Sequence, residues 1–294
     1  MKVAIGSKII DGPWGGGNLF LKNLYEFLEK FKHQVVFDLE DNDIDLILFT
    51  DPRKAGGSTS TITGNQIKRY LSKNKTTVVV QRINECDERK GTKGVNKKYL
   101  RASKLADHVV LVSSWLRDIY ILEGLESTKS SVILSGSNKK FFNQKGIQPK
   151  SLHEKFKIIT HHWSDNWMKG FEAYKKLDTL IEKTNLSDII TFTYLGNFPK
   201  DLNFTSSEII PPKNEQQSAE ILKKHHIYIT GSLFEPSGNH HIEAAQCGLP
   251  ILYKQSGGIP EYCNNFGIAF NNDLEDKLNL IIENYDDLKI NMKK

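Results

Sequence analysis

Two glutamates, Glu235 and Glu243, flank the start of a predicted helix. The Pro-Ser-Gly sequence at 236–238 favours a turn, whereas residues 239–247 have the spacing of a helix. The free N–H groups and the positive dipole end of such a helix attract anions, and phosphate is a common occupant. The spacing therefore predicts an anion site with a carboxylate on each side.

The elements around this turn must position the groups that donate hydrogen bonds to the anion. We expect the backbone N–H groups of Gly238 and Asn239 to face the anion, and the Ser237 side chain to cap the helix. A β-type run at 227–230 precedes the turn, so the site is expected at the carboxyl end of a strand. Open α/β sheets bind their ligands at that edge.

The glutamate pair resembles the Glu-x7-Glu signature of retaining GT-B glycosyltransferases of family four, the glycosyl transferases group 1. Downstream, the Leu-Pro-Ile-Leu run at 249–252 and the Gly-Gly-Ile-Pro-Glu run at 257–261 match the strand and the turn of that family. The resemblance covers nearly the whole chain. It implies an α/β fold of GT-B type, with two Rossmann-like domains whose parallel sheets face each other across a cleft.

The resemblance also implies the role of each site residue. Glu243 would bind the ribose of a nucleotide-sugar donor, such as a UDP-sugar, and Glu235 would bind a hydroxyl of the transferred sugar. Lys169 lies directly before a glycine and matches the lysine that contacts the donor diphosphate. Glu235 and Lys169 are the expected catalytic residues.

The arginine that the family carries five residues before this lysine is replaced by Ser164. We expect Ser164, Asn166 or His162 to supply hydrogen bonds to the donor in its place. The doubled histidines that begin at 161, 225 and 240 do not have the spacing of a zinc site. His225 and His226 are expected to be structural, whereas His240 and His241 lie beside the predicted phosphate site and could point into it.

The implied reaction is retaining transfer of a hexosyl group to an acceptor hydroxyl. The departing nucleotide gathers negative charge on its β-phosphate, and Lys169 with the amides of Gly238 and Asn239 would stabilise that charge. No cofactor and no metal is expected. The aspartates at 41, 43 and 45 precede a strand rather than follow one, so they are interpreted as a solvated turn.

The first half of the chain offers acceptor-side candidates. A strand at 2–6, a glycine-rich loop at 11–17 and a helix follow one another, and by resemblance Gly16 and Gly17 face the transferred sugar and the acceptor. Arg82 and Asn84 follow a predicted strand and are candidate acceptor contacts, with a surface loop of mixed charge as the alternative. The polar segment 139–154 is the expected linker, which gives domains 1–148 and 149–294.

Composition and charge bound the class of protein. The chain has 294 residues, 38% of them hydrophobic and 26% charged, as in soluble globular proteins. No apolar run is long enough for a membrane span, and three scattered cysteines predict neither disulfides nor zinc. We expect a cytoplasmic protein, with association with the cytoplasmic face of a membrane left open.

Positive charge is concentrated in the first half. Residues 1–150 hold 25 Lys and Arg against 16 Asp and Glu, a net charge of +9, and the remainder has 15 against 19, a net charge of −4. The excess favours an anionic acceptor, which would be a glycan, a lipid or a phosphorylated carrier, or contact with an anionic membrane. A merely soluble basic surface is the alternative, and no nucleic-acid partner is expected.

Two other functions remain open. A catalytically silent sugar-nucleotide-binding module is consistent with the missing arginine. A GT-B sugar-nucleotide epimerase would use acid and base carboxylates without an acceptor, and the Glu235–Glu243 signature disfavours it.

Overall fold

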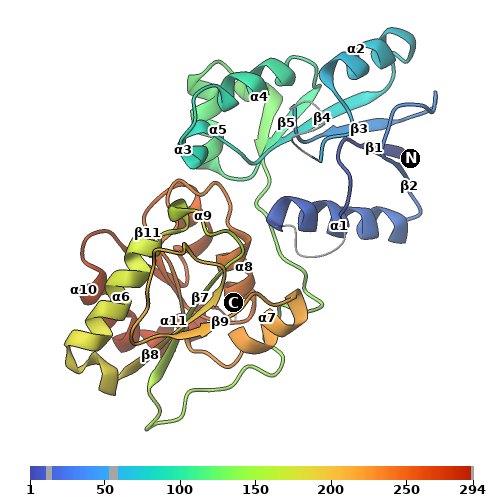
Figure 1. Cartoon of the computed structure of the whole chain (residues 1–294). Coiled ribbons are helices and arrows are strands. Elements are labelled where there is room, and N and C mark those ends of the chain that lie inside the picture. Colours follow the sequence, from blue (N-terminus) through green and yellow to red (C-terminus); the bar gives the residue numbers. More distant parts are fainter. Residues whose placement is uncertain (11–14, 53–58, 293–294) are drawn as a thin grey trace. The chain divides into compact units, whose positions relative to one another are not determined.

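The computed structural model describes residues 1–10, 15–52 and 59–292, and the chain divides into two compact units. The first unit comprises Met1–Leu134 and the second Ser135–Lys294. Figure 1 labels their elements.

The first unit is built on a parallel sheet of six strands in the order β2-β1-β3-β4-β5-β6. The strands are β1 (Lys2–Ile5), β2 (Gln34–Val36), β3 (Leu46–Phe49), β4 (Val78–Ile83), β5 (His108–Leu111) and β6 (Ser130–Val132). Apolar runs such as Leu46–Phe49 form these strands because both faces of the sheet are covered by helices.

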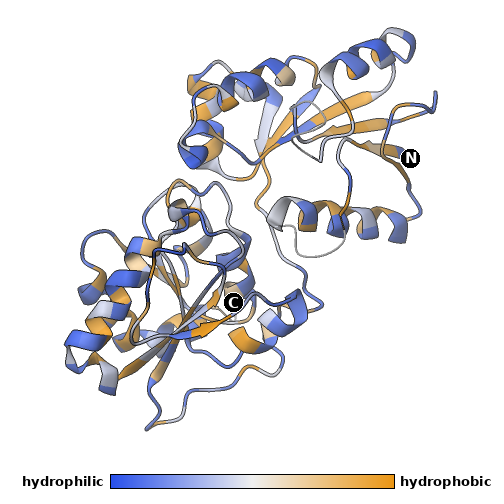
Figure 2. Ribbon diagram, viewed as in Figure 1, coloured by the Kyte–Doolittle hydropathy of each residue, from blue (hydrophilic) through white to orange (hydrophobic). Residues whose placement is uncertain are grey.

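Helices cover the two faces of this sheet. On one face α1 (Gly15–Lys30) buries Leu21 against Val3 and Ile5. The larger core lies on the other face, under α2 (Gly64–Lys73), α4 (Val95–Ser103) and α5 (Ser114–Leu122). Figure 2 shows that the strands are mostly hydrophobic, whereas hydrophobic and hydrophilic residues alternate along the helices. Two single turns, α3 (Asp87–Lys90) and the 3-10 turn η1 (Ser127–Lys129), complete the unit.

The second unit repeats this design, with strand order β12-β11-β10-β7-β8-β9 and parallel pairing throughout. Its strands are β7 (Phe156–His162), β8 (Ile190–Gly196), β9 (Glu208–Ile210), β10 (Ile227–Thr230), β11 (Ile251–Lys254) and β12 (Gly267–Phe270). The predicted α/β class with two parallel-sheet units is thereby confirmed.

Two groups of helices enclose the second sheet. One face carries α6 (Phe171–Lys183), α10 (Leu274–Glu283) and α11 (Tyr285–Asn291). The opposite face carries α7 (Glu215–Leu222), α8 (Asn239–Gln246) and α9 (Ile259–Cys263). The 3-10 turns η2 (Trp167–Lys169) and η3 (Asn185–Asp188) lie on either side of α6 in the chain.

The segment after residue 134 belongs to the second unit, so the division precedes the predicted boundary at 148/149. Phe142 is 1% exposed and packs into the core beneath α7 and α8. The Lys223 ammonium donates to the Phe141 carbonyl at 3.1 Å, and the Gln148 amide donates to the Lys223 carbonyl at 2.9 Å. These contacts fix a polar segment that composition alone marks as a linker.

The new boundary changes the distribution of charge. Residues 1–134 hold 21 Lys and Arg against 16 Asp and Glu, a net charge of +5, and residues 135–294 hold 19 against 19. The difference is smaller than predicted because four lysines lie between residues 139 and 150. Any basic surface of the first unit must therefore be local.

A close approach of two glycines holds the loop after β7 against the loop after β10. Gly170 has a φ of +90°, and a Cβ atom there would lie 2.0 Å from the carbonyl carbon of Gly231. The Gly231 amide in turn donates to the Tyr174 hydroxyl at 3.1 Å. No other residue type fits at position 170 without moving one of these loops.

We expect Gly170→Ala to lower the free energy of unfolding by about 2–5 kcal/mol, from left-handed backbone strain and the clash with Gly231. The matched control is Gly136→Ala, where an added Cβ meets no atom within 4 Å and φ is not left-handed. Urea denaturation of the full chain measures both. Equal stabilities for the two variants would contradict the packing argument.

Candidate functional site

Lys169 and Glu235 form a buried ion pair between two loops of the second unit. Lys169 ends η2, between β7 and α6, and Glu235 lies in the turn between β10 and α8. The Lys169 Nζ and the Glu235 Oε2 are 2.8 Å apart, and the side chains are 16% and 10% exposed. The structure thus brings together the two residues that were expected to be catalytic.

Backbone hydrogen bonds fix the turn that carries Glu235. The Leu233 amide donates to the Met168 carbonyl, and the Gly258 amide donates to the Glu235 carbonyl, both at 2.9 Å. Phe234, between them, has a φ of +47°, which is unfavourable for a residue with a side chain. Strain of this kind persists only where the surroundings over-determine the backbone, and it is concentrated at functional sites.

The N-terminus of α8 has no side-chain cap. The N-cap residue is Gly238, with no side-chain hydrogen bond, so the prediction that Ser237 caps the helix is wrong. The helix begins one residue later than that prediction requires, and the cap position falls on a residue without a side-chain oxygen. A Cβ at Gly238 would lie 2.4 Å from the His240 ring, which explains the glycine.

Glu243 lies one turn inside α8 and pairs with His161, at the end of β7. The His161 Nε2 and the Glu243 Oε2 are 2.8 Å apart, and the side chains are 13% and 10% exposed. The Tyr228 ring packs edge-on against the imidazole with 5.5 Å between centroids. The sequence interpretation gave His161 no role, although a histidine at the carboxyl end of a strand was a usable signal.

The neighbouring histidines are structural. His162 is 3% exposed and its Nε2 hydrogen-bonds to the Tyr174 hydroxyl, so it faces the core rather than a donor, contrary to expectation. The His240 Nε2 lies 2.9 Å from the Thr230 hydroxyl, and burial lowers the pKa of His240 well below its usual value. His225 and His226 are also buried, as expected for a structural pair, and burial lowers the pKa of His226 to about 4.

Two polar residues of the loop after β7 hydrogen-bond within that loop. The Ser164 Oγ accepts from the Asn166 amide at 3.2 Å, and the Asn166 Oδ1 accepts from the Met168 amide at 2.8 Å. These contacts shape the approach to Lys169. Replacement of the missing arginine by Ser164 or Asn166 stays a prediction.

The candidates of the first unit are described by themselves. Gly16 and Gly17 lie in the first turn of α1, which begins at Gly15, rather than in a loop, because glycines can adopt helical angles after the left-handed Gly15. The rest of the predicted loop, residues 11–14, lies outside the described residues. The Arg82 guanidinium stacks 3.9 Å from the centre of the Phe20 ring, and Asn84 follows β4.

The predicted solvated turn at 41–45 is confirmed as an ion-pair cluster. Lys2 Nζ lies 2.9 Å from Asp41 and 2.5 Å from Asp43. Within residues 1–10, 15–52 and 59–292, no group of His, Cys, Asp or Glu has the arrangement of a metal site. The three cysteines are all buried and unpaired with one another.

Comparison with known proteins assigns the C-terminal part of the chain. The family model described as glycosyl transferases group 1 matches residues 200–294, which include Glu235, Glu243 and the 257–261 turn. Residues 200–294 are therefore similar in sequence to the glycosyl transferases group 1. This group 1 segment contains β9 to β12 and therefore the N-terminus of α8.

One curated relative shares sequence with this chain. It is the phosphatidylinositol N-acetylglucosaminyltransferase gpi3 subunit of Schizosaccharomyces pombe, 29% identical over 34% of this chain. The match spans about a quarter of the length of that relative. Like the group 1 match, it supports the resemblance that the glutamate spacing suggests.

The similarity to solved structures covers nearly the whole chain, beyond the residues that the group 1 model matches. Anabaena HepE in complex with UDP covers 99% of this chain and 93% of its own, with a TM-score of 0.69 and 13% identity. Sucrose-phosphate synthase from Thermosynechococcus elongatus covers 99% and 92%, with a TM-score of 0.67 and 14% identity. The chain has the GT-B fold.

Proposed function

We propose that this chain transfers a hexosyl group from a nucleotide sugar to an acceptor hydroxyl, with retention and without a metal. The observation that carries the proposal is the Lys169–Glu235 pair beside the N-terminus of α8, one helical turn from Glu243. The group 1 match and the similarity to a protein solved with UDP support it.

Each group of the site has a definite task in this proposal. The Lys169 ammonium and the amides of Gly238 and Asn239 stabilise the charge that develops on the departing β-phosphate. Glu235 orients Lys169 and accepts a hydrogen bond from the transferred sugar. Glu243, held by His161, binds the ribose, and the leaving phosphate takes the proton of the acceptor hydroxyl.

We place the acceptor on the first unit, where Gly16, Gly17, Arg82 and Asn84 are the candidate contacts. The stacking of Arg82 on Phe20 fixes its guanidinium, a group suited to a carboxylate or a phosphate on the acceptor. The acceptor class we propose is a glycan, a lipid or a phosphorylated carrier in glycan or glycolipid synthesis.

Nucleotide release tests the proposal. The protein is incubated with a panel of UDP-, GDP-, ADP- and dTDP-sugars and a glycan and glycolipid acceptor panel, and the free nucleoside diphosphate and the anomeric configuration of the product are measured. We expect release with one donor and a retained anomeric centre. Donor binding without release would support the silent module instead, and interconversion of the donor sugar without acceptor would support the epimerase.

Activity is expected to survive chelation. Lys169 and the dipole of α8 supply the positive charge that a divalent cation provides in other transferases. Initial rates of nucleotide release are compared in excess EDTA and in excess Mg²⁺ or Mn²⁺, and we expect them to agree within about twofold. Complete loss in EDTA that either metal restores would contradict the metal-free mechanism.

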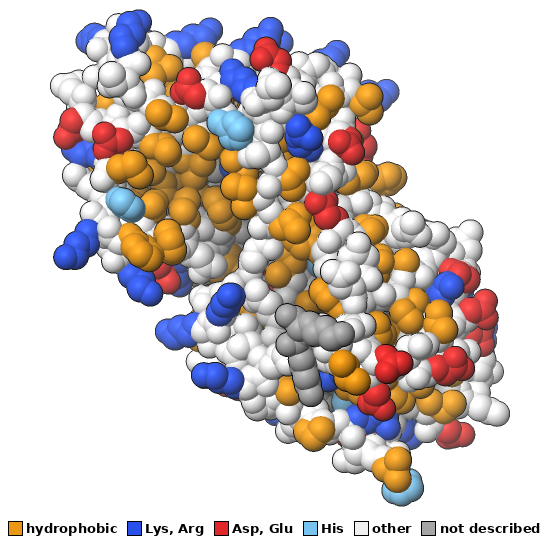
Figure 3. All heavy atoms as spheres, turned by 180° about the vertical axis from the view of Figure 1, so that it is seen from behind, with side chains coloured by type: hydrophobic (Ala, Val, Ile, Leu, Met, Phe, Trp, Pro, Cys, Tyr) orange, Lys and Arg blue, Asp and Glu red, His pale blue; other side chains and the backbone are white. Residues whose placement is uncertain are grey.

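A local basic face on the first unit is a candidate contact for an anionic acceptor or membrane. Helix α4 buries Asn96, Tyr99 and Ala102, and the residues on its opposite side and at its end are exposed. The exposed basic residues there are Lys97, Lys98, Arg101 and Lys104. On the face drawn in Figure 3, by contrast, Lys and Arg side chains are interspersed with Asp and Glu.

We expect binding to anionic vesicles that weakens with salt, because each basic residue near such a surface contributes about 1 kcal/mol and is screened within about 8 Å. Vesicle flotation compares the wild type with Lys97→Glu/Lys98→Glu, which should bind least. Lys73→Glu/Lys75→Glu makes the same charge change at the end of α2 and is the control. Equal binding to neutral and anionic vesicles would contradict this expectation and would favour a soluble acceptor.

No described helix has the length and apolar content needed to cross a bilayer.

A further inference from the structure

Trp163 is an exposed aromatic residue at the carboxyl edge of the second sheet. It directly follows His162, the last residue of β7, and it is 45% exposed. The Asn197 backbone amide donates to the His162 carbonyl at 3.1 Å, and the Asn197 side-chain amide donates to the Trp163 carbonyl at 2.7 Å. The pairing of β7 with β8 thus continues to Trp163. Tryptophan is highly buried on average, so an exposed indole at the edge where open α/β sheets bind ligands is a candidate ligand contact.

The alternation of side chains along β7 places Trp163 on the side of the sheet that carries α8. Ile158 packs in the core under α6, whereas Ile159 packs in the core under α7 and α8. Two residues further along, His161 contacts Glu243 of α8. Because residues two apart in an extended segment share a face, Trp163 continues the face of His161.

Trp163 lies within reach of a base whose ribose is bound by Glu243. A strand rises about 3.3 Å per residue, so the Trp163 backbone lies about 7 Å beyond His161 toward the ligand edge. In a nucleoside the base is bonded to the same five-membered ring as the ribose hydroxyls. An indole that begins two residues beyond the ribose site can therefore cover the base.

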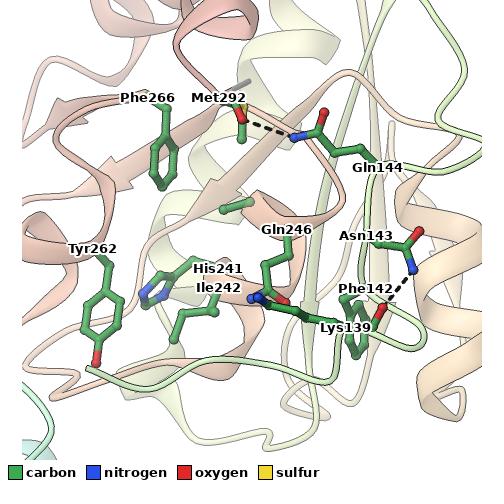
Figure 4. A pocket seen from close by; sticks show the side chains of 11 residues that line it. Lys139, Phe142, Asn143, Gln144, His241, Ile242, Gln246, Tyr262, Phe266 and Met292 are labelled. Atoms are coloured by element: carbon green, nitrogen blue, oxygen red, sulfur yellow. Dashed lines mark hydrogen bonds between the residues drawn. The ribbon is translucent and has the colours of Figure 1, made fainter. Parts of the chain in front are cut away.

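The cavity beside α8 does not offer this base another place. Figure 4 shows the cavity, which has a volume of about 480 Å³ and is lined by Ile242 and Ala245 of α8 among other residues. Neither Glu243 nor His161 lines it. A base joined to a ribose at Glu243 is therefore expected at the sheet edge.

We propose that Trp163 stacks on the base of the nucleotide-sugar donor and thereby raises the affinity for the nucleotide. This inference rests on the proposed function, because it takes the ribose site at Glu243 as given. Every base has a π-face, and alanine substitution of an aromatic stacking residue weakens binding about 5- to 150-fold. Trp163 thus raises affinity without fixing which base is bound.

Calorimetric titration tests this proposal. ADP, CDP, GDP, UDP and dTDP are titrated into the wild type, and the one that binds is then used with the variants. We expect Trp163→Leu to raise its dissociation constant by about tenfold or more, because leucine is apolar but has no π-face. Trp163→Phe keeps a ring and should retain the affinity within about threefold. Trp167→Leu is the matched control, since Trp167 is 44% exposed in the same loop but packs edge-on against Phe171.

Tryptophan fluorescence gives a second readout, which a merely structural role of Trp163 would not change. The chain has four tryptophans, and a base that stacks on one indole quenches the fluorescence of that indole. Saturating nucleotide should quench the wild type and Trp167→Leu, but not Trp163→Phe, although Trp163→Phe still binds. Thermal unfolding confirms that each variant is folded.

The outcomes separate this inference from the proposed function. Equal affinity and equal quenching in the wild type and in Trp163→Leu would overturn the role of Trp163 and leave the donor site intact. A loss of affinity in Trp163→Leu that Trp163→Phe does not restore would overturn stacking as the cause. Binding of none of the five nucleotides to the wild type would overturn both this inference and the donor site.

Discussion

Lys169→Met is expected to lower kcat for nucleotide release by about 10²–10³-fold, the usual cost of removing one donor that stabilises a developing oxyanion. The Lys169 ammonium lies 2.8 Å from the Glu235 carboxylate. Methionine keeps the length of the side chain and removes its charge. The measurement is the initial rate of nucleotide release at saturating donor.

Loss of the ammonium also affects stability, and a control must separate the two effects. Lys169→Met breaks the ion pair with the Glu235 carboxylate, which is 10% exposed, and breaking a buried pair costs about 3–5 kcal/mol. The double variant Lys169→Met/Glu235→Gln removes both charges and should recover most of that stability. Its kcat should stay low, and a double variant with wild-type kcat would show that Lys169 acts only on folding.

Glu243→Ala is expected to raise the dissociation constant for the nucleoside diphosphate by about 10- to 100-fold. A charged hydrogen bond to the ribose contributes about 1.5–3 kcal/mol, and the variant also leaves His161 without its partner at 2.8 Å. The matched control is Glu283→Ala, an exposed glutamate at the end of α10 in the same unit. Calorimetry measures both affinities, and unchanged affinity in Glu243→Ala would remove that residue from the site.

Local patterns in the sequence predicted the strands and the turn that carry the site. The β-type residues Ile-Tyr-Ile-Thr at 227–230 were predicted to form a strand, and β10 has the same bounds. All four residues are buried in the structure. The turn at 236–238 and the helix after it follow from the residues that disfavour helix there. By contrast, β12 was missed, since only Phe270 of its four residues is buried and the run has no clear alternation.

Contacts between residues far apart in the chain could not be predicted from the sequence. His161 and Glu243 are 82 positions apart, and nothing local to either residue indicates that the ends of β7 and α8 meet. The division after residue 134 was not predicted for a similar reason, since burial of Phe142 and the hydrogen bonds to Lys223 join a polar segment to the second unit. The prediction for the N-cap of α8 was wrong by one residue. The N-cap is Gly238 rather than Ser237.

Titration of nucleoside diphosphates into the wild-type protein tests the central claim most directly. ADP, CDP, GDP, UDP and dTDP are compared by calorimetry in EDTA, and each is repeated with Glu243→Ala and with Lys169→Met/Glu235→Gln. The account predicts that one nucleotide binds the wild type and that both variants weaken it by at least about tenfold. Binding of none of the five, or equal binding to all three proteins, would contradict a donor site at the N-terminus of α8.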